Sequence, residues 1–175
     1  IKKMVNFVAA TKILDIGCGI KTVLHFLPGE KYGLDPLAEE YKKIYDYPPD
    51  IRVIKGHGEN MPFSENTFDV VFCTNALDHA ENPARVIQEI HRTLKPNGFF
   101  ILIVELIEKV RRSKAGRVGH PHDLTVFDVE KLLNNKFRVI FKKTSPFIGI
   151  REYYLGRRKE RHNDELIIVA KIIKI

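Results

Sequence analysis

Residues 13–19 read Ile-Leu-Asp-Ile-Gly-Cys-Gly, an apolar run that contains one acid and ends in two glycines one residue apart. This pattern predicts a buried β-strand that ends in a tight loop, because glycine lacks a Cβ atom and tolerates positive φ angles. A second apolar stretch, residues 32–36, places Asp35 at the end of the next strand. In a parallel β-α-β unit the two strand ends are neighbours, so this carboxylate can accept hydrogen bonds from ribose hydroxyls. We therefore expect a ligand that contains a nucleoside.

The residues around the glycines distinguish between kinds of nucleoside ligand. A dinucleotide-binding loop has a third glycine three residues after the second, and Thr22 stands at that position. Asp15, two residues before the first glycine, would repel a pyrophosphate but would suit an amine or a sulfonium. A glycine turn in another kind of α/β protein is the alternative interpretation.

Length and composition set limits on the class of protein. The chain has 175 residues, enough for one domain with a buried core, and we expect residues 1–175 to form one domain. It has no apolar run long enough to span a bilayer and no signal-peptide pattern, and its start at Ile1 favours a fragment or a processed form. Its two cysteines make no disulfide framework, so we expect a cytoplasmic location. A net charge of +7 is compatible with nucleic-acid or anionic small-molecule partners.

Alternating strand and helix patterns predict a doubly wound α/β sheet with right-handed crossovers. Continuous apolar runs are typical of parallel strands that are buried on both faces. The predicted strands are residues 12–16, 31–35, 51–55, 67–73, 99–104, 137–142 and 166–173. The predicted helices are residues 37–46, 83–94 and 126–134. No convincing helix separates the last two strands, so they should pair antiparallel.

The predicted helices carry signals for their ends and for their buried sides. Asn82 followed by a proline marks the start of the second helix, and Thr125 with Asp128 resembles a capping box at the start of the third. In the first helix we expect a buried side that includes Leu37 and Ile44.

Taken together, these motifs resemble those of class I S-adenosylmethionine-dependent methyltransferases. The resemblance rests on residues 15–19 with Asp35, on residues 56–63 and 68–71, and on the Leu-Lys-Pro-Asn-Gly turn at residues 94–98. It implies a Rossmann-like sheet of seven strands, mostly parallel, with an antiparallel last strand inserted between the fifth and the sixth. It also implies S-adenosylmethionine as the cofactor.

The resemblance assigns cofactor contacts to residues at the ends of the first four strands. Asp15 would lie near the methionine amino group, Asp35 would hold the ribose hydroxyls, and Asn75 would lie beneath the methionine. For Glu59 and Asn75, a turn or capping role is the alternative. The backbone at Gly17, Cys18 and Gly19 would line the methionine and the ribose. The implied adenine contacts are Pro36, Leu37, His57, Gly58 and Glu59.

Two residues depart from the family pattern. Lys21 stands where many relatives have a third glycine, and its ammonium either pairs with the cofactor carboxylate or remains solvated. His57 replaces an aspartate that in many relatives accepts a hydrogen bond from the adenine amino group. A neutral imidazole nitrogen can also accept such a bond.

Histidines are the candidate catalytic groups. Methyl transfer needs alignment of acceptor, methyl carbon and sulfur, and a general base helps when the acceptor is a hydroxyl or an amine. The candidates are His79, beside Asp78 after the fourth strand, and His120 and His122, after the fifth, and both loops should open at the same edge of the sheet. The alternatives are a packing or capping role for His79 and an exposed pair at His120 and His122. These two histidines alone do not predict a metal site.

The acceptor is less closely defined. Basic residues in two connections either frame an anionic acceptor or form a solvated rim together with the acids between them. Residues 74–77 lack the Asn-Pro-Pro-aromatic motif of enzymes that methylate amino groups of DNA and RNA. We favour direct, in-line transfer to an oxygen or nitrogen of a small, anionic metabolite. An RNA or protein methyltransferase and a catalytically silent interaction subunit are the alternatives. The basic residues are Lys109, Arg111, Arg112, Lys114, Arg117, Arg151, Arg157, Arg158, Lys159 and Arg161.

Overall fold

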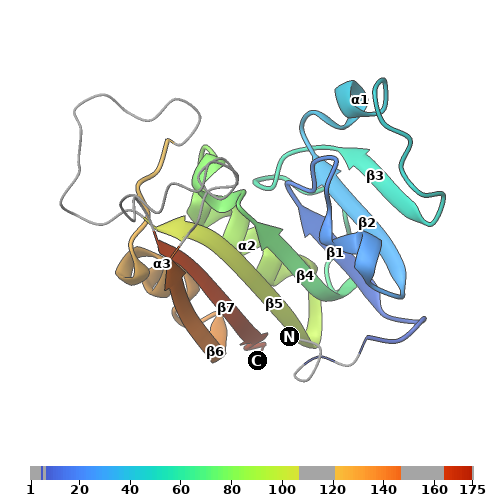
Figure 1. Ribbon diagram of the computed structural model, residues 1–175. Coiled ribbons are helices and arrows are strands. Elements are labelled where there is room, and N and C mark those ends of the chain that lie inside the picture. The colour runs from blue at the N-terminus through green and yellow to red at the C-terminus, as the bar shows by residue number, and fades with distance from the viewer. Residues whose placement is uncertain (1–4, 6, 107–120, 147–163, 175) are drawn as a thin grey trace.

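A twisted sheet of seven strands organises the protein (Figure 1). The computed structural model describes residues 5, 7–106, 121–146 and 164–174. The strands are β1 (Lys12–Ile16), β2 (Glu30–Asp35), β3 (Ile51–Lys55), β4 (Phe68–Thr74), β5 (Leu94–Leu106), β6 (Phe137–Pro146) and β7 (Asp164–Ile172).

The strand order β3-β2-β1-β4-β5-β7-β6 confirms the fold class predicted from the sequence. The neighbours from β3 to β5 pair in parallel, whereas β7 lies between β5 and β6 and is antiparallel to both. The order reverses between β1, whose chain continues to β2, and β4, whose chain continues to β5. Open α/β sheets bind ligands outside the carboxyl ends of the strands at such a reversal.

The strands in the middle of the sheet are buried on both faces, as their continuous apolar runs predicted. Along β4, Val71 and Cys73 belong to the apolar cluster on one face, and Val70 and Phe72 belong to the cluster on the other. Helices α2 (Pro83–Thr93) and α3 (Val126–Leu133) cover the first face (Figure 1). On the second face the short 3₁₀ helix η1 (Val23–Phe26) contributes to the cluster, and Phe7 stacks on Phe72 with ring centroids 6.2 Å apart.

The caps of the two longer helices lie where the sequence predicted them. The Asn82 side chain accepts a hydrogen bond from the backbone N–H of Arg85 at the start of α2. At the start of α3, Thr125 and Asp128 form a complete capping box. These contacts satisfy backbone N–H groups that have no partner within the helix.

The predicted helix over residues 37–46 was wrong in its length and in its buried side. Helix α1 spans only Ala38–Tyr41, and Leu37 and Ile44 are 49% and 76% exposed. Ala38 is its only buried residue, so no apolar side chain fixes a longer helix to the sheet. Tyrosine and isoleucine are also modest helix formers, and the chain continues in turns instead.

Two sequence predictions fall on residues that the structure does not describe. The absence of a helix between the last two strands concerns mainly residues 147–163, and the predicted basic residues lie in 107–120 and 147–163, all outside the described residues. Within the described ranges, no helix has the length and apolar character that crossing a membrane requires.

A buried carboxylate connects α2 to the loop that follows β3. Glu89 is 4% exposed, and its side chain accepts hydrogen bonds from the backbone N–H of Met61 at 2.9 Å and from the Arg92 guanidinium at 2.7 Å. Arg92 also donates to the carbonyl oxygens of Met61 and Phe63. The hydrogen bonds from Arg92 hold the pKa of Glu89 below its usual range. This contact fixes the β3–β4 loop against the helix.

We expect Glu89→Ala to lower the free energy of unfolding by about 2 kcal/mol, because it removes charge-assisted hydrogen bonds and leaves their donors unpaired. The matched control is Glu130→Ala in α3, which breaks an ion pair to Lys142 with both side chains 45% exposed. That loss should stay below about 1 kcal/mol. Urea denaturation measures the free energy of unfolding of both variants. Equal decreases would contradict a role of Glu89 in holding the β3–β4 loop against α2.

Candidate functional site

A cavity of about 470 Å³ opens at the carboxyl ends of β1, β2 and β4, beside the reversal of strand order. Several of the predicted site residues line it together. They are Gly17, Gly19, Asp35, Pro36, Leu37, His57, Gly58, Glu59, Asn75 and His79. The structure therefore brings most of the predicted cofactor contacts and one candidate base to the same space.

The two glycines of the first loop are required for different reasons. Gly17 has a φ of 66°, and a Cβ atom there would lie 2.4 Å from the Cβ of Ala76. Gly19 has a φ of 51°, and a Cβ atom there would meet no atom within 4 Å. Gly17 thus permits close packing on the loop after β4, whereas Gly19 leaves its backbone open to a ligand.

Asp35 holds the glycine loop in place and also faces the cavity. Its carboxylate accepts hydrogen bonds from the backbone N–H of Gly19 and of Leu37, each at 2.9 Å. A carboxylate has about four lone-pair sites, so both oxygens can accept further hydrogen bonds. The side chain is 6% exposed and lines the cavity, which is the arrangement expected of a group that accepts bonds from ribose hydroxyls.

Asp15 is a buried carboxyl group that lies close to the cavity without lining it. The Thr22 hydroxyl donates a 2.6 Å hydrogen bond to Oδ2, whereas Oδ1 is buried with no hydrogen-bond partner among the described residues. Burial raises the pKa of Asp15 from 3.8 to about 7. Hydrogen bonds from the Thr22 hydroxyl and the Val23 backbone lower this pKa, and the charge of Asp35 raises it. A buried carboxyl group with a partnerless oxygen disfavours ionisation, and a cation beside that oxygen would favour it.

The side chain of Cys18 points away from the cavity. Its Sγ packs so closely on Gly33 that a Cβ atom at that glycine would lie 2.7 Å away. Burial raises the pKa of the thiol to about 12, so it is not a reactive nucleophile. Only the backbone of Cys18 therefore remains available for the ligand contact that the family resemblance implied.

The loop after β3 contributes His57, Gly58 and Glu59 to the cavity. The Glu59 carboxylate also accepts a hydrogen bond from the backbone N–H of Asn82 at 3.3 Å, and its carbonyl oxygen accepts one from Arg85 at 3.2 Å. These bonds favour the alternative role of Glu59, which is to anchor its loop to the start of α2. His57 is exposed at the cavity and has space for a ligand.

The loops after β4 and β5 meet, as the sequence predicted. The backbone N–H of His122 donates to the carbonyl oxygen of Asp78 at 3.4 Å, and His122 Nε2 lies 3.2 Å from the carbonyl oxygen of Glu81. His79 lines the cavity, and its Nε2 lies 4.0 Å from Oδ2 of the buried Asp78. His122 itself does not line the cavity, and His120 lies outside the described residues.

Sequence reasoning missed several residues of the cavity wall. Tyr41, Ala80 and Glu81 line it, and Asn75 turns into it with a left-handed φ of 49°. Glu81 follows His79 by two residues, so its position after β4 was a signal that could have identified it. Tyr41 is the last residue of the short helix α1 and lies at the cavity.

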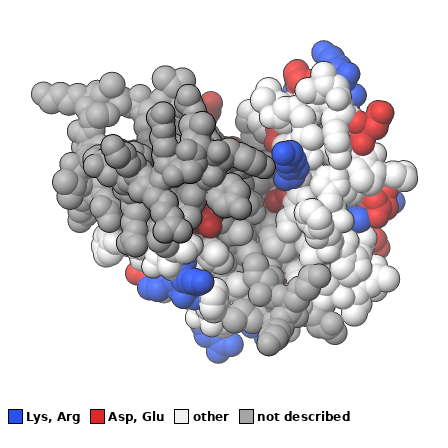
Figure 2. Space-filling view, in the orientation of Figure 1, with Lys and Arg blue, Asp and Glu red and all other residues white. Residues whose placement is uncertain are grey.

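Charged side chains are mixed on the surface beside the site. In the part of this face that the described residues form, Lys and Arg stand singly or in small groups among Asp and Glu (Figure 2). None of the described residues that line the cavity is Lys or Arg, whereas Asp35, Glu59 and Glu81 are acids.

Comparison with known proteins identifies the family. The family model described as "Methyltransferase domain" matches residues 14–102, which include the glycine loop, Asp35 and β4. The chain belongs to this family. Structures of related methyltransferases share its fold, and the cofactor of these class I enzymes is S-adenosylmethionine.

Several relatives define how far the similarity extends. The sterol 24-C-methyltransferase ERG6 of Saccharomyces cerevisiae is 34% identical over 128 residues, which cover 67% of this chain and 32% of the yeast protein. The structure of YcgJ from Bacillus subtilis matches with a TM-score of 0.72 at 19% identity, covering 99% of this chain and 96% of that one. A putative methyltransferase in complex with the Trm112 methyltransferase activator of Haloferax volcanii matches with a TM-score of 0.72 at 19% identity, covering 97% and 85%. The chain spans only a quarter to a third of the length of the sterol methyltransferases that it matches.

The residues of this methyltransferase domain fit S-adenosylmethionine. The cofactor carries a cationic ammonium group and two ribose hydroxyls. The cavity wall offers Asp35 for the hydroxyls and, at Gly19, a backbone with no side chain to obstruct a ligand. The buried, partnerless Oδ1 of Asp15 suits the ammonium. The donor and acceptor types therefore match the cofactor of the family.

Asp15 makes the stability of the cofactor-free domain depend on pH. Because the folded-state pKa is raised from 3.8 to about 7, the folded state retains a proton that the unfolded state has already released. The free energy of unfolding should therefore fall as the pH rises from about 4 to about 7, by at most about 1.4 kcal/mol per pH unit from this group. Asp15→Asn should remove this contribution. Denaturant titrations across this pH range test it, and parallel pH curves for the two proteins would contradict it.

Proposed function

We propose that this chain transfers the methyl group of S-adenosylmethionine directly, in line, to an oxygen or nitrogen atom of a small acceptor. The observation that carries the proposal is that His79 lines the same cavity as the glycine loop and Asp35. His79, the candidate general base, and Asp35, the candidate ribose contact, thus line the same cavity. When bound, the cofactor supplies an electrophilic methyl group on a sulfonium with a neutral leaving group, so the chain needs no covalent nucleophile.

Binding and orientation of the cofactor would fall to the ends of β1, β2 and β4. In this proposal the Asp15 carboxylate pairs with the ammonium group, and Asp35 accepts bonds from the ribose hydroxyls. Asn75 supports the methionine from the end of β4. The adenine would be held by Pro36, Leu37, His57 and Gly58, while Glu59 anchors their loop to the start of α2. The backbone of residues 17–19 would follow the methionine and the ribose. Support comes from the cavity lining, the partnerless Oδ1 of Asp15 and the open space at Gly19.

His79 is the proposed general base. It is exposed at the cavity, and the buried carboxylate of Asp78 is 4.0 Å from its Nε2. His122 is better suited to joining the two loops, because its ring faces the carbonyl oxygen of Glu81. His120 remains a candidate base within the undescribed range 107–120.

Two observations bear on the class of acceptor. The acids among the described lining residues do not attract anions, so the anionic character of the acceptor rests on the basic residues of 107–120 and 147–163. The similarity to sterol 24-C-methyltransferase ERG6, together with Ala76, Ala80 and Val86 in the wall, favours an apolar acceptor as the second candidate. RNA, a protein acceptor with a helper subunit, and a silent interaction module are the other outcomes to be distinguished.

Isothermal titration calorimetry with S-adenosylmethionine tests cofactor binding. Asp35→Ala should weaken the affinity by at least about 100-fold, because it removes charge-assisted hydrogen bonds of about 1.5–3 kcal/mol each. Glu59→Gln, at the same cavity, should change the affinity far less, because the Glu59 carboxylate is bonded to the backbone N–H of Asn82. Thermal unfolding of each variant shows that it is folded. If the wild-type chain gives no heat of binding, the enzyme proposal is wrong and the catalytically silent interaction subunit is the remaining alternative.

Methyl transfer from radiolabelled S-adenosylmethionine tests the acceptor and the base. The panel contains phosphate- and carboxylate-bearing metabolites, a sterol and RNA, so that each candidate class gives its own product. On a hydroxyl or amine acceptor, His79→Gln should reduce turnover by about 100-fold or more, while the affinity for the cofactor stays within about twofold. His122→Gln is the matched control and should retain most of the turnover. An unchanged rate in His79→Gln would exclude it as the base.

A further inference from the structure

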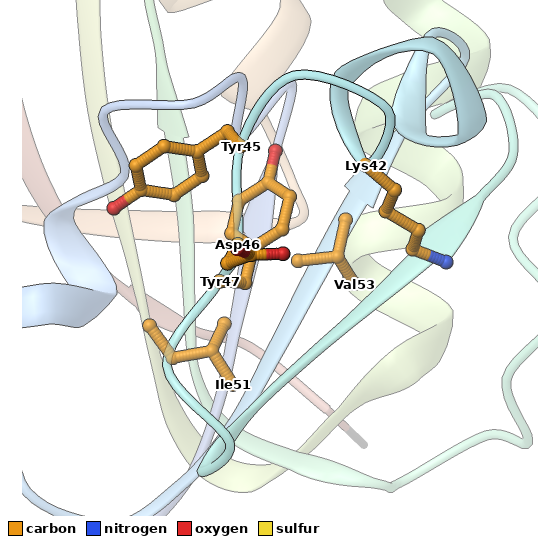
Figure 3. Close-up of a pocket in the computed structure, with 6 residues that line it drawn as sticks. All are labelled: Lys42, Tyr45, Asp46, Tyr47, Ile51 and Val53. Carbon is orange, nitrogen blue, oxygen red and sulfur yellow. The ribbon is translucent and has the colours of Figure 1, made fainter.

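A second hollow, of about 190 Å³, lies between α1 and β3 and shares no lining residue with the cofactor cavity (Figure 3). Its walls include the rings of Tyr45 and Tyr47, the side chain of Val53 and two oppositely charged residues, Lys42 and Asp46. The Tyr45 and Tyr47 rings meet edge to face, with centroids 5.0 Å apart. Neither tyrosine lines the cofactor cavity.

The hydroxyl group of Tyr47 reaches the glycine loop from this hollow. It donates a 2.8 Å hydrogen bond to the carbonyl oxygen of Gly19, 28 residues earlier in the chain. Its ring packs on the apolar cluster that contains Cys18 and Val53, and Pro48 follows it and restricts its backbone. Desolvation raises the pKa of Tyr47 to about 12, so the phenol remains a donor throughout the neutral range.

Gly19 is therefore held through both of its backbone polar groups. Its N–H donates to Asp35 Oδ2 at 2.9 Å, and its carbonyl oxygen accepts from Tyr47 at 2.8 Å. A glycine at a φ of 51° has ready access to other backbone conformations, because it has no Cβ atom to exclude them. The two hydrogen bonds restrict that freedom at the residue whose backbone is open to the cavity.

We propose that Tyr47 is a positioning residue for the cofactor, acting through the hydrogen-bond series Tyr47–Gly19–Asp35. The proposal rests on the proposed cofactor binding. Tyr47 does not itself line the cavity, so it acts by fixing the Gly19 peptide. Through the Gly19 N–H it also fixes the orientation of the Asp35 carboxylate. Preorganisation of this kind contributes to affinity because the loop need not be ordered when the ligand binds.

The decisive variant is Tyr47→Phe, which keeps the ring and its packing but removes the donor. Tyr45→Phe is the matched control, since the Tyr45 hydroxyl has no hydrogen-bond partner among the described residues and the ring shares the same hollow. Calorimetric titration with S-adenosylmethionine should show about tenfold weaker binding for Tyr47→Phe and no change for Tyr45→Phe. In the cofactor-free protein, the NMR signal of the Gly19 amide should shift and its hydrogen exchange should accelerate only in Tyr47→Phe.

The outcomes separate this inference from the proposed function. Normal cofactor affinity in Tyr47→Phe, with a tightly binding wild type, overturns the positioning role and leaves the proposed function intact. Equal losses in both tyrosine variants overturn it as well, because they show that packing in the hollow matters rather than the hydroxyl. Absence of binding to the wild-type chain overturns both proposals. Weaker binding and faster Gly19 exchange confined to Tyr47→Phe support the inference.

Discussion

The parallel pairing of β1 with β2 is the constraint on which the site depends. Register places Ile16 beside Leu34, so the chain leaves β1 directly over the end of β2. There the Gly17 N–H bonds to the Leu34 carbonyl oxygen at 2.8 Å, and the Gly19 N–H bonds to Asp35 at 2.9 Å. A shift of register would separate these groups and move the buried side chains of the strand to the wrong face. The loop geometry, the open backbone at Gly19 and the placement of Asp35 therefore have a common origin.

Features fixed by local sequence could be predicted, because each depends on residues close together in the chain. The strand runs, the Asn82 and Thr125 caps and the glycine loop are of this kind. Helix α1 was predicted too long because the spacing of apolar residues does not show whether another element packs against the apolar side of a helix. Propensity and periodicity are overridden where tertiary packing offers no partner.

The features of the site that could not be predicted from the sequence are contacts between segments that lie far apart in the chain. The hydrogen bonds from the Asn82 backbone N–H to the Glu59 carboxylate and from the Tyr47 hydroxyl to the Gly19 carbonyl oxygen join segments more than twenty residues apart. No motif marks such pairs, since a turn glutamate and a half-buried tyrosine are common in any α/β protein. By contrast, the meeting of the loops after β4 and β5 was predictable, because parallel topology alone puts both at one edge.

In the proposed binding mode, the buried carboxyl group of Asp15 would discriminate among adenine nucleosides. A ligand with adenosine but no ammonium group offers no cation to the partnerless Oδ1, and near neutral pH the carboxyl group then keeps much of its proton. A ligand that brings an ammonium group favours the ionised carboxyl, and their attraction is strong because the surroundings exclude water. The site would thus distinguish a nucleoside that carries an ammonium group from one that lacks it through the protonation state of Asp15 rather than through the shape of the cavity. Selectivity of this kind strengthens as the pH rises and weakens as acid returns the proton to Asp15.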